Sequence, residues 1–395
     1  MVRPQGWEKS GAARPSTRPF PIAFLYWGRR GALPRFTLDL AQALIARPDT
    51  DIHISISYQN ELFAHYAWLG DRLLPIETFD SAAGVVRTAP AIPGRIADIR
   101  RRLQQRDVRA VVVLMAHLWT PLLAPQLNRA GIAYIPVVHD ATAHAGDITG
   151  IANRWLLRDL HHADRIVTLS REVTRALVAS GRAPDERIDT LFHPDLSYGS
   201  IRSAELDDEA PLRILFFGRI LRYKGLPLFL DAIDLLARRG MRVAAGVFGA
   251  GDLGNSGKRL RALGVEVANR WIDDGEVPSI LARYDVMVLS HTSASQSGVA
   301  AAALGAGMPV VMTPVGGLVD QIEHEKTGLI ARRVDAEALA EAIGRLAQNR
   351  VMLRSMIDEI RRRRGQRSMA AFVDQIVPLA RRAAEGIAAR PCLNA

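Results

Sequence analysis

Two cations stand close together in the glycine-bounded segment Gly218–Gly225. Arg219 and Lys224 lie five residues apart, directly after a predicted strand and before a predicted helix. A guanidinium and an ammonium at the carboxyl end of a strand suit a diphosphate, because the flanking glycines allow a ligand to approach the backbone closely. The competing interpretation is an ordinary helix start that carries two surface cations.

A second anion-binding pattern follows at Gln296, Ser297, Gly298 and Val299, ahead of the small-residue run 300–303. Ser297 is a suitable N-cap for a helix through that run. The free N–H groups of such a helix start, together with the helix dipole, would hold an anion. Most Ser-Gly helix starts only cap a helix, so this turn indicates a phosphate site only in combination with the two cations.

A dinucleotide site is an alternative for the same half of the chain. The segment Gly249–Gly254 matches G-x-G-x-x-G after a predicted strand, and Asp273 follows about 20 residues later, as such a site requires. However, this strand is the second of its half rather than the first. The oxidoreductase that this motif would indicate competes poorly with the basic pair.

One group of residues raises the question of a metal. His139, Asp140, His144 and Asp147 carry suitable ligand atoms, but their spacing fits no zinc or facial-triad template well. No second cluster supports them. We therefore predict no metal site.

These residues must be positioned by an alternating α/β chain. From Pro19 onward, short β-branched runs alternate with helical stretches such as 335–348, a pattern typical of parallel sheets covered by helices on both faces. Strands are predicted at 22–27, 52–57, 111–115, 134–139 and 166–169, and again at 213–217, 243–248, 265–268, 286–290 and 310–313. The polar, acidic stretch His193–Pro211 separates the halves as a predicted linker. Two open parallel sheets leave a cleft, and ligands bind at the carboxyl ends of their strands.

Composition narrows the class of protein. A chain of 395 residues with 48% hydrophobic residues is too long for one ordinary core, so we expect two domains. Cys392 is the only cysteine, which excludes a disulfide framework and a cysteine-bound metal cluster. The longest apolar run, 110–116, falls far short of the roughly 20 residues that span a membrane. Residues 1–18 contain no apolar block and are predicted as a flexible tail rather than a secretory signal. Together these features predict a cytoplasmic protein.

The net charge of +10 is shared evenly between the halves. Residues 1–205 hold 25 basic and 20 acidic residues, and residues 206–395 hold 26 and 21, which leaves +5 in each. This even division argues against a dedicated nucleic-acid module. The clusters Arg100–Arg102 and Arg361–Arg364 could contact anionic lipid headgroups or a phosphate-bearing acceptor, although solvated helix faces are the plainer interpretation.

Taken together, the motifs resemble those of the retaining glycosyltransferases of family 4, also described as glycosyl transferases group 1. The segment Gly218–Gly225 matches that family's diphosphate-binding G-R-x4-K-G, and Gly249 with Gly251 matches its G-x-G turn after the second strand. The signatures G-x-P-V-V-x-T, G-G and T-G-L follow in order at 307–313, 316–317 and 327–329. The resemblance covers nearly the whole chain and is densest from 214 to 331.

The resemblance implies the GT-B fold, an α/β architecture of two facing Rossmann-like domains with a deep cleft between them. It places an acceptor domain at 19–200, completed by a C-terminal helix at about 367–388. It places a nucleotide-sugar-binding domain at 201–366.

The resemblance also implies roles for individual residues. Arg219 and Lys224 would act on the diphosphate, and His139, at a strand end, would contact the transferred sugar. Gly31 belongs to a glycine loop whose backbone would approach the donor phosphate. Trp271 and Ile272 would line the nucleobase pocket. The full set expected to bind the donor comprises Gly31, Gly218, Gly249, Gly251, Trp271, Ile272, Gln296, Ser297, Gly298 and Val299.

One departure from the family pattern stands out. Many members carry two glutamates, separated by seven residues, before the G-x-P-V-V signature. The corresponding positions here are Ala294 and Ala302, whose side chains accept no hydrogen bond. The sequence therefore resembles a variant that lacks the paired glutamates but keeps the phosphate-binding turn.

The function that follows is a hexosyl- or related glycosyltransferase. It would move a sugar from a nucleotide-diphosphate donor to a hydroxyl of a saccharide or lipid-linked saccharide, with retention of configuration, in bacterial polysaccharide synthesis. No cofactor other than this donor substrate is expected, and no nucleic-acid partner. Peripheral contact with the inner face of a membrane is an additional expectation. Candidate aromatic faces for the acceptor come from the first half, although core packing is the expected role of most of them: Tyr26, Trp27, Trp68, Trp119 and Trp155.

Two alternatives stay open. The absence of the paired glutamates fits a degenerate nucleotide-sugar-binding or scaffold protein. A sugar epimerase or phosphorylase of the same fold is the other. It would need a cleft acid and base or a pyridoxal-bound lysine, and neither Lys258 nor Lys326 has a convincing setting for one.

Overall fold

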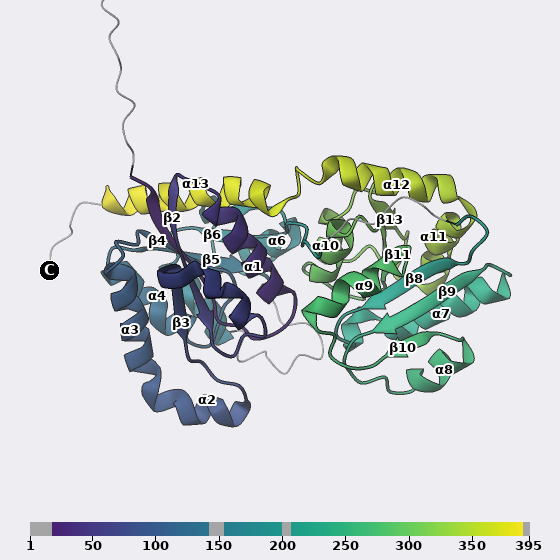
Figure 1. Ribbon diagram of the computed structural model, residues 1–395, viewed down its shortest axis with the longest axis horizontal. Coiled ribbons are helices and arrows are strands. Elements are labelled where there is room, and N and C mark those ends of the chain that lie inside the picture. Colours follow the sequence, from purple (N-terminus) through teal and green to yellow (C-terminus); the bar gives the residue numbers. More distant parts are fainter. Residues whose placement is uncertain (1–17, 142–153, 200–206, 390–395) are drawn as a thin grey trace, which may run out of the picture.

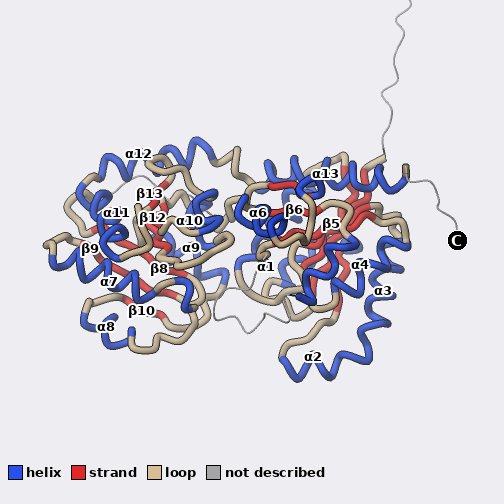
Figure 2. Tube along the Cα trace, turned by 180° about the vertical axis from the view of Figure 1, so that it is seen from behind, coloured by secondary structure: helices blue, strands red, loops and turns tan. Residues whose placement is uncertain are grey.

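The computed structural model describes residues 18–141, 154–199 and 207–389. Within these ranges the chain forms two α/β domains that lie side by side (Figure 1). Each domain is built on one sheet of parallel strands, and helices cover both faces of each sheet (Figure 2). The architecture is the predicted pair of Rossmann-like domains. The expected tail, 1–18, lies outside the described residues except for Arg18, and so does the predicted boundary at 200.

The first domain contains a seven-stranded sheet in the order β3-β2-β1-β4-β5-β6-β7. Its strands are β1 (Phe20–Tyr26), β2 (Thr50–Ser57), β3 (Leu73–Ile76), β4 (Ala110–Val113), β5 (Ala133–Val138), β6 (Ile166–Thr168) and β7 (Ile188–Thr190). Its helices are α1 (Ala32–Ile45), α2 (Ala82–Thr88), α3 (Ile92–Gln104), α4 (Thr120–Arg129) and α6 (Arg171–Ala179), with 3₁₀ turns η1 (Phe63–Arg72), η2 (Ala89–Ala91), η3 (Leu157–His162) and η4 (Asp185–Arg187).

The second domain contains a six-stranded sheet in the order β10-β9-β8-β11-β12-β13. Its strands are β8 (Leu212–Phe217), β9 (Val243–Phe248), β10 (Glu266–Ala268), β11 (Val286–Leu289), β12 (Val310–Met312) and β13 (Gly328–Ile330). Its helices are α7 (Leu226–Arg238), α8 (Ser256–Ala262), α9 (Val277–Ala282), α10 (Gly298–Gly305), α11 (Ala336–Gln348) and α12 (Arg350–Arg363), with 3₁₀ turns η5 (Arg222–Lys224), η6 (Asp274–Glu276) and η7 (Gly316–Asp320).

Alternation along the strands builds the core on both faces of each sheet. In β1, Ile22 and Phe24 point into one apolar cluster, whereas Ala23 and Leu25 point into the cluster on the opposite face. All four side chains are almost fully buried. A strand with two buried faces needs apolar residues at consecutive positions, which is the pattern of the predicted runs.

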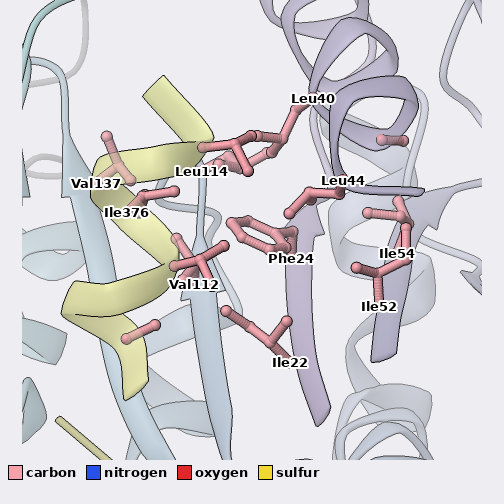
Figure 3. Close-up of a cluster of buried hydrophobic side chains, with 14 of the residues drawn as sticks. Ile22, Phe24, Leu40, Leu44, Ile52, Ile54, Val112, Leu114, Val137 and Ile376 are labelled. Carbon is pink, nitrogen blue, oxygen red and sulfur yellow. The ribbon is translucent and has the colours of Figure 1, made fainter. Parts of the chain in front are cut away.

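The last helix, α13 (Met369–Ala388), belongs to the first domain. Phe372, Ile376 and Leu379 recur at helical spacing and are buried. Ile376 lies beside Val112 and Phe24 of the first sheet (Figure 3). The chain therefore crosses between the domains twice.

The two crossings are bound to each other. The Asp195 N–H donates to the Arg367 carbonyl at 2.9 Å, and the Arg367 guanidinium pairs with the Asp195 carboxylate at 3.1 Å. The start of the predicted linker is buried rather than loose, since Leu196 is fully covered and its N–H donates to the Ala301 carbonyl. The segments that connect the two domains are thus packed against each other in their described part.

All ten predicted strands are present, with ends shifted by at most two residues. The helix predicted at 335–348 is α11, and Asp335 caps it by accepting a hydrogen bond from the Ala338 N–H. Sequence reasoning missed β3, β7 and β13. Each is a strand of three or four residues at a sheet edge, too short to show a periodic pattern. Within the described ranges, no helix combines the length and the hydropathy needed to cross a bilayer.

Candidate active site

The predicted residues converge where the order of the strands reverses in each sheet. This reversal falls between β1 and β4 in the first domain and between β8 and β11 in the second. Connections leave in opposite directions at such a point, so a crevice opens outside the carboxyl ends of the strands. Gly31 follows β1, Arg219 and Lys224 follow β8, and Gln296 follows β11. His139 follows β5 at the same end of the first sheet.

Lys224 is a buried cation at the end of η5, with 8% of its surface exposed. A Cβ placed on Gly218 would lie 3.4 Å from its Nζ. Burial, and secondly the charge of Arg219, lowers the pKa of Lys224 to about 8. Neither Lys224 nor Arg219 makes an ion pair among the described residues. Arg219 is exposed to solvent, whereas Lys224 is buried. A buried, unpaired ammonium is costly, and a bound anion would relieve that cost.

Glycines make this loop possible. Gly218 and Gly225 have positive φ angles of 93° and 69°. A Cβ on Gly225 would stand 1.9 Å from the Ser290 carbonyl oxygen, so the turn before α7 excludes any other residue. Beside it, a Cβ on Gly249 would stand 2.0 Å from the Gly218 carbonyl oxygen. A Cβ on Gly251 would stand 2.2 Å from the Ile220 carbonyl oxygen, and these two residues form an isolated β-bridge. Gly249 and Gly251 thus shape the cation loop by lying against it.

The dinucleotide interpretation finds no support in the position of its acidic residue. Asp273 caps η6 in a reciprocal capping box with Glu276. Its carboxylate therefore caps a 3₁₀ turn and is not free to bind a ribose hydroxyl.

The expected helix start at α10 is present, with one correction. The Ser297 hydroxyl caps the helix by accepting from the Ala300 N–H at 3.3 Å. The Ser297 N–H, expected to be free for an anion, instead donates to Gln321 Oε1 at 2.6 Å, and Gln321 returns a hydrogen bond to the Ser297 carbonyl. Gln321 was not anticipated because it lies 24 residues away in a segment without a motif. The N–H groups of Gly298 and Val299 remain in the first turn, where no intrahelical carbonyl reaches them.

Two helix N-termini meet at the domain interface. A Cβ on Gly298, the first residue of α10, would lie 2.4 Å from the Ala32 Cβ, the first residue of α1. The Val299 side chain also approaches the cation loop, since a Cβ on Gly218 would lie 3.1 Å from it. Each helix N-terminus carries a partial positive charge. Lys224 adds a full positive charge beside the start of α10.

Glu61, which sequence reasoning missed, ties Trp271 to the glycine loop. Its carboxylate accepts from the Gly31 N–H at 3.1 Å and from Trp271 Nε1 at 3.0 Å. Burial raises its pKa. The Arg30 guanidinium also lies over the Trp271 ring, 5.4 Å from its centroid. The Gly31 amide, expected at a donor phosphate, is thus bound to Glu61, while Ile272 packs against the apolar cluster beneath α10.

His139 makes a second contact between the domains. Its Nε2 lies 2.6 Å from the Leu114 carbonyl oxygen, which can only accept, so Nε2 carries the proton. The Nδ1 lone pair therefore accepts from the side-chain amide of Gln296. Burial lowers the pKa of His139, which keeps the ring neutral.

A cavity of about 550 Å³ opens between the domains beside Glu61. Arg35 of α1 and Asp274 of η6 form an ion pair across it at 3.2 Å, and Tyr198 lies beneath the Arg35 guanidinium. The remaining lining residues include His65, Asp273, Gly275 and Pro278.

The structure distinguishes among the aromatic candidates of the first domain. Tyr26, Trp27 and Trp119 are at most 2% exposed, so they belong to the core and offer no acceptor face, whereas Trp68 is 47% exposed. His144 and Asp147 lie outside the described residues. Within the described part of the chain, no three His, Cys, Asp or Glu side chains gather as metal ligands would.

Comparisons with known proteins agree with this arrangement. Residues 211–349 match the family model described as glycosyl transferases group 1. The amylovoran biosynthesis glycosyltransferase AmsK of Erwinia amylovora is 29% identical over 196 residues, which cover 46% of this chain and 47% of AmsK. The matched part therefore spans less than half of that relative's length.

Solved structures extend the likeness to the whole fold. Sucrose-phosphate synthase from Thermosynechococcus elongatus superposes with a TM-score of 0.71 at 17% identity, over 93% of this chain and all of that one. Anabaena Alr3699/HepE in complex with UDP gives 0.68 at 16% identity, over 91% and 99%. The chain thus has the GT-B architecture and contains a glycosyl transferases group 1 domain.

Proposed function

We propose that this protein is a retaining glycosyltransferase. It would transfer a sugar, a hexose or a related residue, from a nucleotide-diphosphate donor to a hydroxyl of a saccharide or lipid-linked saccharide. The meeting of Lys224, Arg219 and two helix N-termini at the domain junction carries this proposal. The names of the matched proteins, and the UDP bound in the Anabaena structure, support the donor class.

Charge stabilisation is the main catalytic device in this proposal. Negative charge accumulates on the diphosphate as the glycosidic bond breaks. Lys224, Arg219 and the N–H groups of Gly298 and Val299 lie where they would stabilise that charge. Preorganised donors of this kind contribute about 10²- to 10³-fold in rate each.

We expect retention from the family resemblance, and the absence of a side-chain nucleophile decides which retaining route is open. Ala294 and Ala302 are 7% and 3% exposed, and neither side chain carries a polar atom. A double displacement needs a carboxylate beside the anomeric carbon, and neither position supplies one. The departing phosphate oxygen would take the proton from the acceptor hydroxyl on the face from which it leaves, as the acceptor oxygen forms the new bond. The two cations supply the charge for this step, so it requires no metal ion.

The first domain would receive the acceptor, in bacterial polysaccharide synthesis on the cytoplasmic side of a membrane. Helices α2 and α3 are the part of this domain suited to an anionic lipid surface. Residues 82–106 hold six arginines and one aspartate, a net +5 that equals the excess of the whole first half. This segment projects from the domain (Figure 1), and Val86 is 75% exposed on it. Arginines on α3 and in Arg361–Arg364 pair with neighbouring carboxylates: Arg95, Arg101, Arg102, Arg361, Arg362 and Arg363. Arg87 on α2, by contrast, is exposed and forms no ion pair among the described residues.

Vesicle sedimentation tests the membrane contact. We expect the protein to pellet with anionic vesicles but not with neutral ones, and salt to release it. Arg87→Glu should weaken this binding, whereas Arg362→Glu in the paired cluster should not. Equal pelleting of both variants would refute the assignment of this surface.

Product analysis tests the reaction itself. The protein is incubated with nucleotide-diphosphate sugars and a panel of saccharide and lipid-linked acceptors, and the anomeric configuration of the product is read by NMR. We expect a new glycosidic bond with the configuration of the donor. An inverted product would contradict the mechanism. Donor binding without transfer or hydrolysis would favour the degenerate binding protein that Ala294 and Ala302 suggest.

A further inference from the structure

Gln296 is held in an unusual setting on the loop between β11 and α10. Its amide nitrogen donates to His139 Nδ1 of the other domain. Its amide oxygen, Oε1, is shielded from solvent and has no hydrogen-bond donor among the described residues. Buried amide oxygens are nearly always paired, because leaving one unpaired costs free energy.

The orientation of this amide is set by His139. The Leu114 carbonyl takes the Nε2 proton, so Nδ1 presents only a lone pair. Only the NH₂ end of the Gln296 amide can bond to that lone pair. The opposite end, Oε1, is thereby turned away from the histidine.

The unpaired oxygen lies on the same turn as the phosphate-binding groups. Gln296 precedes the N-cap Ser297 and stands two and three residues before Gly298 and Val299. Val299 in turn flanks Gly218, as does Lys224 Nζ. A sugar attached to a diphosphate held at these groups would be within reach of Gln296, whereas the nearby Ala294 offers it no acceptor.

We propose that Gln296 Oε1 accepts a hydrogen bond from a hydroxyl of the transferred sugar, and that His139 is the positioning residue that aims this oxygen. The proposal rests on the proposed function and adds a specificity determinant to it. His139 acts through Gln296 instead of touching the sugar itself.

The test compares the affinities of a nucleoside diphosphate and its sugar, measured by calorimetry on the full chain. In Gln296→Leu, we expect the affinity for the sugar nucleotide to fall about 3- to 10-fold, as for one neutral hydrogen bond. Affinity for the diphosphate alone should stay within about twofold. Gln104→Leu, an exposed glutamine on α3, is the matched control and should change neither.

Deoxy-sugar donors sharpen the test. The donor that lacks the hydroxyl bound by Gln296 should bind the wild type more weakly than the complete donor does. Its affinity should fall no further in Gln296→Leu, because both changes remove the same hydrogen bond. His139→Phe should reproduce the loss, since it releases the amide. Gln296→Glu should make sugar-nucleotide affinity depend on pH, because a carboxylate can bind Nδ1 only when the ring is protonated.

Each result is decisive. An equal loss of affinity for the diphosphate and its sugar in Gln296→Leu would overturn this inference and leave the proposed function intact. Additive losses with every deoxy donor would overturn it as well. If the wild type bound no nucleoside diphosphate, the proposed function would fail and the inference with it.

Discussion

The two domains contribute different kinds of side chain at the carboxyl ends of their strands. On the second-domain side, a buried ammonium and the first-turn N–H groups of α10 face the interface without anionic partners among the described residues. On the first-domain side, the strand ends carry an aromatic cluster in which Trp27, His117 and Trp119 contact one another edge to face. Trp27 and Trp119 are almost fully buried, and burial lowers the pKa of His117 to about 3.

This contrast indicates that the groups for binding a donor are constrained in type and spacing, whereas those for binding an acceptor can vary. Every nucleotide-diphosphate sugar presents the same diphosphate, so a side that binds such a donor needs cations and N–H groups at set spacings. An acceptor is recognised by the shape of a surface, which many side chains can build. The second domain therefore holds a buried cation without an anionic partner among the described residues, whereas the aromatic strand ends of the first domain are already packed.

The largest effect should come from that core. Phe372→Ala removes a fully buried ring that α13 packs against the first sheet, and we expect a loss of about 3 to 5 kcal/mol in the free energy of unfolding. Denaturant unfolding measures it. Val351→Ala, 71% exposed on α12, is the control and should change little. A loss below about 1 kcal/mol would show that α13 is not part of the core.

Lys224→Met should nearly abolish catalysis without harming the fold. Loss of this preorganised cation is expected to lower kcat/KM about 10²- to 10³-fold. Lys258→Met, on α8 of the same domain and outside the site, is the control and should retain normal turnover. Steady-state kinetics with the donor decide the matter, and similar rates in the two variants would remove Lys224 from the site.

Arg219→Ala tests the exposed partner of Lys224. The same device predicts a loss of up to about 10²-fold, less than for Lys224, because solvent screens an exposed charge. Arg222→Ala is the matched control, an arginine three residues further along the same loop. If both substitutions lowered the rate alike, general electrostatic attraction would explain the effect better than a built site.

The smallest effect concerns pH. Lys224 has a pKa of about 8 in the free protein, and a bound diphosphate would raise it, so binding above pH 8 must take up a proton. The affinity for the diphosphate should then fall by up to about tenfold per pH unit above pH 8. Below pH 8, the ionisation of Lys224 should no longer change this affinity. Calorimetry in buffers of different ionisation enthalpy detects the proton. Lys224→Arg should bind without it, and uptake by that variant would point to another group.

Much of this molecule could be predicted from the sequence, for identifiable reasons. The central strands are buried on both faces and therefore carry long apolar runs, and the cation loop needs glycine at Gly218 and Gly225 for its positive φ angles. Edge strands such as β13 have only three residues and leave no pattern. Glu61 and Gln321 were missed because their roles arise from contacts across 210 and 24 residues of chain. Such pairings depend on the assembled fold.

The central claim is that Lys224 marks a built diphosphate site, and thermal unfolding of the wild type and Lys224→Met tests it most directly. The two proteins are compared at pH 7 with and without a panel of nucleoside diphosphates. Folding lowers the pKa of Lys224, so its charge destabilises the free protein below pH 8, and Lys224→Met should raise the stability of the free protein by about 1 to 3 kcal/mol.

One nucleoside diphosphate, at about 100 times its Kd, should add about 2.7 kcal/mol to the wild type, a shift of several degrees in Tm, and nothing to Lys224→Met. A variant that is more stable alone but unresponsive to the nucleotide is the predicted result. Equal nucleotide shifts in both proteins, or none in the wild type, would contradict the account.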